Sequence, residues 1–181
     1  MTYPVFASGD VLNASDMNAV GLWLVKTQTI GSGVSSVAVT GAFSADYDKY
    51  LVTISGGVGS TSSAHNITFG STTTGYYWAA NYSQYNAAAG GFFNGNNDTA
   101  FKECFYGSTG ALAFCMEVTN PFASANTLVS WRHGGAATTT INLSVVGNGY
   151  LANTTSYTAF TITPVSGTLT GGTIRVYGYR N

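Results

Sequence analysis

The stretch that decides the fold is YTAFTIT, residues 157–163, in which the side chains alternate between two faces. Successive side chains of a β-strand point to opposite sides, so a period of two predicts a strand with one buried and one solvated face. Phe160 and Ile162 share one face, and we expect both in the core. Ala159 and Thr161 share the other face.

The segment TIRVYGYR, residues 173–180, has the same period. Ile174 and Val176 form an aliphatic face. The opposite face carries Arg175, Tyr177 and Tyr179. A strand of this composition can bury both faces if another chain covers the second one.

Short runs of this kind, bounded by Gly, Asn or Ser-Thr clusters, continue from Val25 to the end of the chain. The predicted strands are 25–30, 36–40, 50–55, 66–69, 76–82, 101–106, 111–118, 128–133, 140–146, 157–163 and 173–179. Many short strands with few helices between them indicate an all-β fold. We expect an antiparallel β-sandwich, jelly-roll-like, over residues 25–181.

The N-terminal part differs, because residues 12–24 have the signals of a short helix. Asn13 is a good N-cap, and Met17, Val20 and Leu24 recur at helical spacing. A helix of about ten residues is marginal by itself in water, so it must lie against an apolar surface. Residues 1–24 are therefore predicted to form an arm, whose helix packs either on its own domain or on other copies or a larger particle.

The composition limits the function. Only 7% of the residues are charged, 45% are hydrophobic and 14% are aromatic, with a net charge of −1. Disordered chains lack aromatic residues, and nucleic-acid binding needs clustered Lys and Arg, so we expect neither. No apolar run is long enough for a membrane span and no secretion signal is recognisable, which predicts a protein without membrane insertion. A nearly uncharged surface suits repeated contacts in an assembly.

Residues able to support metal or catalytic chemistry are scarce. The only His and Cys residues are His65, His133, Cys104 and Cys115, and no zinc motif, G-x-S-x-G elbow or phosphate loop occurs. The seven acids are scattered, and Glu103 and Glu117 are expected on the same hairpin. The sequence therefore predicts no metal, no cofactor and no catalytic site.

The two cysteines flank the turn GSTG, residues 107–110. A two-residue loop would place Cys104 opposite Ala113, whereas a four-residue loop would place it opposite Cys115, within reach of a disulfide. Both registers remain open. Assembly in a reducing cytoplasm favours free, buried thiols.

One segment suits surface recognition. Residues 76–97 combine Tyr, Trp and Phe with Asn and Gln, a combination that can stack on sugar rings and bind hydroxyl groups. About half of these aromatics are expected in the core, and residues 86–99 are predicted to be a long loop. The candidates for contact with a receptor or glycan are Tyr82, Tyr85, Phe92 and Phe93.

Three segments together resemble virion structural proteins of tailed bacteriophages, of the tail-fibre, receptor-binding or head-decoration type. They are FASGDVLNASDMNAV (6–20), GAFSADYDKYLVTISGG (41–57) and GGTIRVYGYRN (171–181). The resemblance implies an attachment arm and a displayed β-sandwich, often a trimer. It would place Phe6, Gly9, Leu12 and Asn18 in the arm, and Ile174, Val176, Tyr177 and Tyr179 in the closing strand.

We therefore expect a non-enzymatic virion protein, assembled in the host bacterial cytoplasm, that binds copies of itself and other tail or capsid proteins. The expected attachment and oligomer contacts are Phe6, Leu12, Met17, Val20 and Leu24. The aromatic segment favours a receptor-binding role toward a host surface glycan. The absence of a repetitive shaft favours a compact tip, an adaptor or a capsid decoration (cement or head-fibre) protein. The alternative from another class is a carbohydrate-binding module or carbohydrate-active enzyme.

Overall fold

The computed structural model describes residues 8–9, 11, 21–85, 87–108, 110–136 and 142–179. Within these ranges the chain forms β-strands and no helix, which confirms the all-β prediction. The strands are β1 (Leu22–Thr29), β2 (Val37–Thr40), β3 (Lys49–Ser55), β4 (Val58–Gly59), β5 (Ser63–Phe69), β6 (Tyr76–Gln84), β7 (Gly90–Asp98), β8 (Phe101–Gly107), β9 (Ala113–Thr119), β10 (Thr127–Ala136), β11 (Asn142–Leu151), β12 (Ala159–Pro164), β13 (Leu169–Thr170) and β14 (Thr173–Tyr179).

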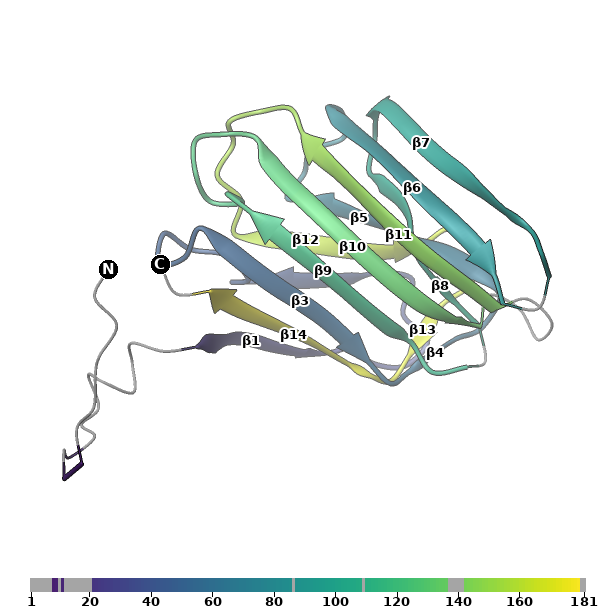
Figure 1. The fold of residues 1–181 in the computed structure, drawn as a ribbon, viewed down its shortest axis with the longest axis horizontal. Helices are drawn as coiled ribbons and strands as arrows, with labels where there is room; N and C mark the ends of the chain where they lie inside the picture. Colours follow the sequence, from purple (N-terminus) through teal and green to yellow (C-terminus); the bar gives the residue numbers. More distant parts are fainter. Residues whose placement is uncertain are drawn as a thin grey trace.

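The strands form two stacked layers. One sheet has eight strands in the order β1-β14-β3-β9-β10-β11-β6-β7, and the other has four in the order β2-β12-β5-β8. Figure 1 shows the larger sheet in front of the smaller one, with the short pair β4 and β13 at one end. Neighbouring strands are antiparallel throughout. A jelly roll divides eight strands between two sheets, whereas here the larger sheet alone has eight.

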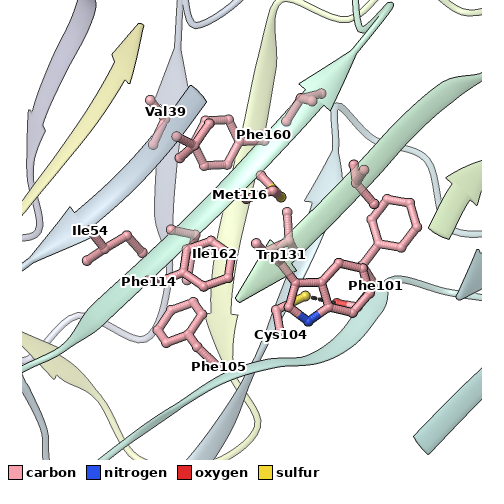
Figure 2. Packing of buried hydrophobic residues seen from close by; sticks show 14 of the residues in the cluster. Val39, Ile54, Phe101, Cys104, Phe105, Phe114, Met116, Trp131, Phe160 and Ile162 are labelled. Carbon is pink, nitrogen blue, oxygen red and sulfur yellow. Dashed lines mark hydrogen bonds between the residues drawn. The ribbon is translucent and has the colours of Figure 1, made fainter. Parts of the chain in front are cut away.

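The core lies between the two sheets and follows the alternation in the sequence. Phe160 and Ile162 of β12 are fully buried, as predicted, and so are Ile174 and Val176 of β14. Aromatic side chains join the layers: the rings of Phe105 in β8 and Phe114 in β9 lie 4.7 Å apart, and those of Phe101 in β8 and Trp131 in β10 lie 6.0 Å apart. These rings meet in Figure 2. Full burial of such a side chain contributes about 1.5–3 kcal/mol each.

The segments β8 and β9 do not form the predicted hairpin. β8 belongs to the four-stranded sheet and β9 to the eight-stranded sheet, so the chain crosses from one layer to the other between them. Neither proposed cysteine register exists: both thiols are free, Cys104 is buried, and Cys115 is partly exposed. The prediction of a shared hairpin for Glu103 and Glu117 is therefore wrong. Alternation shows which side chains are buried but not from which sheet they reach the core.

Two further predictions need correction. Leu24 lies in β1, not in a helix, because β14 pairs with this segment from Leu22 to Thr29. Pairing with β14 gives this segment backbone hydrogen bonds to a neighbouring strand, whereas a short isolated helix is only marginally stable. Residues 12–20, the rest of the predicted helix, lie outside the described residues. The predicted loop over 86–99 contains β7, an edge strand paired with β6 despite its Gly and Asn content.

Two of the three segments that carry the resemblance, 41–57 and 171–181, meet at one end of the large sheet. β3, from segment 41–57, pairs with β14, from segment 171–181, along its whole length, and β1 pairs with the other side of β14. The Gly pairs of both segments are in backbone contact: a Cβ on Gly172 would overlap the Gly56 carbonyl group. At the other end of β14, the Tyr47 ring covers Gly178 so closely that a Cβ there would overlap it. These motif residues therefore build the framework.

Candidate functional site

The candidate site lies on the outer face of the eight-stranded sheet, the face turned away from the four-stranded sheet. In β10 the side chains of Trp131 and His133 point inward and are buried, while Arg132 points outward and is exposed. Arg132 belongs to a row of cross-strand partner residues that runs across the whole sheet. The row consists of Thr27, Arg175, Thr53, Cys115, Arg132, Val146, Asn81 and Phe92.

This face is hollowed around Arg132. One hollow, of about 430 Å³, includes Glu117, Ser130 and Asn148 in its lining. A second, of about 470 Å³, includes Tyr85. The two share Cys115, Arg132 and Val146 in their lining and lie side by side over β9, β10 and β11; together they are called the depression. The sheet is hollow here because its outward positions carry small side chains or none. These positions are Ala113, Cys115, Ser130, Gly134 and Ser144.

Glu117, at one side of the depression, is held by two partners. Lys49 Nζ lies 2.8 Å from Glu117 Oε2, and the Tyr179 hydroxyl donates a 2.9 Å hydrogen bond to Glu117 Oε1. The hydrogen bonds from Lys49 and Tyr179 lower the pKa of Glu117, and the charge of Arg132 adds to this effect. Glu117 is therefore ionised at neutral pH, which makes it unsuited to act as a general acid.

The two arginines of this row differ in their surroundings. Arg175 Nη1 donates a 3.1 Å hydrogen bond to Ser55 Oγ. Across the described part of the chain, no residue forms a hydrogen bond or salt bridge with Arg132. Because Glu117 is already paired with Lys49, the charge of Arg132 remains available to a ligand.

The predicted aromatic contacts divide into two pairs. Tyr82 and Phe93 are partly buried and stacked, with ring centroids 4.8 Å apart, and they pack against the core. Tyr85 and Phe92 are exposed, at 62% and 74%. Tyr85 lines the depression, and its hydroxyl lies close to Gly134. The structure therefore brings only Tyr85 of these four to the depression.

The predicted attachment contacts lie mostly outside the described residues. Phe6, Leu12, Met17 and Val20 are among the residues whose structure is not described. Leu24 is exposed in β1 next to Leu22, at the edge of the large sheet. Leu24 pairs with Tyr177, and Leu22 with Tyr179. Leu22 and Leu24, at the end of the predicted arm, thus form an exposed apolar pair at this edge.

The histidines and acids do not assemble into a reactive cluster. Nowhere in the described ranges do three or more His, Cys, Asp or Glu side chains gather as they would around a metal ion. His65 and His133 are buried, with each Nδ1 bonded to a backbone carbonyl, of Phe105 and Ala113 respectively. Asp98 pairs with Lys102, and Glu103 accepts a hydrogen bond from Tyr106. Glu117 is the only described carboxylate that lines the two hollows around Arg132.

The sequence reasoning missed Arg132. The signal was available, because residues 128–133 were predicted as a strand and Trp131 is the strongest core residue within it. Period two then places Ser130, Arg132 and Gly134 on the opposite face. Small residues on both sides of a lone Arg indicate a charged side chain next to open space on the sheet face.

The two thiols are expected to differ in reactivity. Burial raises the pKa of the Cys104 thiol well above its ordinary value, whereas Cys115 opens onto the depression. A thiol reagent such as Ellman's reagent should modify one Cys per folded chain and both after denaturation. The variant Cys115→Ser should have no rapidly reacting thiol. Equal reaction rates for both residues in the folded protein would contradict this placement.

No protein-family model matches the chain, and no curated protein is significantly similar to it. Among the residues that the structure describes, no helix has the length and hydropathy of a membrane span.

Proposed function

We propose that this protein is a non-enzymatic structural component of a tailed-bacteriophage particle, a β-sandwich displayed on the surface and attached through its N-terminal segment. In this proposal it self-associates, as a trimer, and its outer sheet face contacts the host surface. The role is that of a tail-fibre or receptor-binding appendage.

The contact between two of the three resembling segments is the main support. Segments 41–57 and 171–181 are more than a hundred residues apart in the sequence, yet β3 and β14 pair residue by residue from Lys49 and Tyr179 to Ser55 and Thr173. Segment 6–20 leads into β1, which pairs with β14. Two resembling segments that pair as neighbouring strands support a shared scaffold better than scattered matches would.

The outer face supports a role in recognition. It combines a depression lined by hydroxyl, amide and guanidinium groups with exposed aromatic residues, Tyr85 and Phe92. Its Glu117 is held ionised by Lys49 and Tyr179 and offers no proton for catalysis. Binding without turnover suits this arrangement.

Deleting residues 1–20 tests the arm. The deletion leaves β1 intact, so we expect a folded protein with an unfolding midpoint within about 2 °C of the full chain, because the described core lies in residues 21–179. Incorporation into particles should be lost. Circular dichroism and quantitative blotting of purified particles measure the two effects. Unfolding of the truncated protein would mean that the segment belongs to the core, which would contradict the arm.

Immunogold labelling of intact particles tests the location. Labels at the tail tip support the receptor-binding role, whereas labels spread over the head support the alternative of a capsid decoration protein. The hollow and its tyrosine also suit a free carbohydrate-binding module or carbohydrate-active enzyme. Turnover of a polysaccharide by the purified protein would overturn the structural role.

A further inference from the structure

We propose that the depression around Arg132 binds the carboxylate group of an acidic saccharide, an assignment that rests on the surface-recognition role proposed above and names its ligand class. Arg132, whose guanidinium no described residue binds, lines both hollows, and the other polar groups of their described lining are neutral or, like Glu117, already paired.

The charge of Arg132 favours an anionic ligand. Arg132 lies between Cys115 and Val146 in the cross-strand row, and neither neighbour can balance its charge. The nearby acid, Glu117, is bound by Lys49 and Tyr179. The local balance is therefore one uncompensated positive charge. A planar guanidinium recognises a carboxylate through two parallel hydrogen bonds.

The groups around Arg132 suit a saccharide. Ser130 and Asn148 line one hollow, and Ser144 and Tyr85 line the other. Hydroxyl and amide groups match the hydroxyl groups of a sugar, and an exposed tyrosine ring can stack on a pyranose face. Each hollow, of about 430 or 470 Å³, falls in the volume range of small-molecule sites.

The charge of the depression favours a carboxylate over a phosphate. A phosphate monoester carries close to two negative charges at neutral pH and is usually bound by several cations or by backbone N–H groups at a helix N-terminus. The described lining of the depression offers one cation, Arg132, which can balance one negative charge but not two. A singly charged carboxylate fits this balance better.

The test uses the full-length protein on an array of hexuronate and sialylated oligosaccharides, each paired with its carboxyl-reduced counterpart. We expect binding to at least one acidic member and at least about tenfold weaker binding to its reduced partner. The variant Arg132→Gln should lose binding to the same extent, and Arg132→Lys should be intermediate because it keeps the charge without the planar fork.

The matched control is Arg175→Gln. Arg175 lies in the same row but is bonded to Ser55 and lines neither hollow, so this variant should bind as the unaltered protein does. Equal binding to acidic and reduced saccharides, binding to none of them, or equal losses in the two Arg variants would overturn the assignment. Binding of a sugar phosphate as strong as that of the best carboxylate would overturn it too.

The outcomes are distinguishable from those for the proposed function. If the protein is found on particles but binds no acidic saccharide, only the ligand assignment is overturned. If the protein is absent from particles but binds acidic saccharides through Arg132, the virion role is overturned and the binding site is supported.

Discussion

Replacing Gly172 with Ala is expected to lower the free energy of unfolding by about 3–5 kcal/mol. Gly172 has a φ of 89°, in the region that disfavours residues with a Cβ, and a Cβ there would overlap the Gly56 carbonyl group. Backbone atoms cannot rotate out of the way as a flexible side chain can. The substitution therefore forces β3 and β14 apart at the end where the two Gly pairs meet.

The matched control is Gly33→Ala. Gly33 has a φ of 63°, yet no atom of another residue lies within 4 Å of an added Cβ. It should lose only about 1–2 kcal/mol, the cost of the left-handed backbone conformation. Urea unfolding followed by tryptophan fluorescence measures both variants. Equal losses would contradict the close backbone approach and, with it, the interpretation that the glycines of the resembling segments build the framework.

Acidification from about pH 7 to about pH 5 is expected to lower the free energy of unfolding by about 2 kcal/mol through His65 alone. Burial lowers the pKa of His65 from 6.5 to about 4, against the weaker raising effect of its bond to the Phe105 carbonyl, and the charge of His133 lowers it further. Between these two pKa values the unfolded chain binds a proton that the folded chain does not. Stability therefore falls as the pH falls through this window.

His133 acts in the same direction, because burial also lowers its pKa. The variant His65→Asn, whose amide can still reach the Phe105 carbonyl, should show a clearly smaller loss over the same pH range, even if its stability at neutral pH is lower. Chemical unfolding at each pH measures this slope. Asp98 and Glu117, whose pKa values are lowered by their partners, lose their contributions only at more acidic pH. An unchanged slope in the variant would contradict the assignment to His65.

The fold was predictable where one strand face is apolar. Phe160, Ile162, Ile174 and Val176 lie in the core because a period of two admits only one arrangement that buries them. The connection between β8 and β9 was not predictable. A hairpin and a crossover between layers both bury the same aromatic side chains, and a turn sequence such as GSTG is compatible with either.

The candidate site was predictable only in part. The aromatic and amide content of residues 76–97 predicts surface recognition there. In the structure, Tyr82 and Phe93 stack toward the core, while Phe92 and Tyr85 are exposed. For Arg132 the sequence indicates only an outward residue between small neighbours, because the hollows beside it are made by residues from separate strands.

By itself the sequence determined that this protein is all-β, nearly uncharged and built from strands with one apolar face, because composition and periodicity are local properties of the chain. Only the tertiary structure decided which strands pair. That pairing brings β1, β14 and β3 together, places the Gly pairs in contact, and leaves Arg132 without a partner among the described residues, beside a Glu117 that Lys49 already binds. The reason is physical: hydrogen bonds between strands can form at any sequence separation, so alternation determines the faces of a strand but not its neighbours.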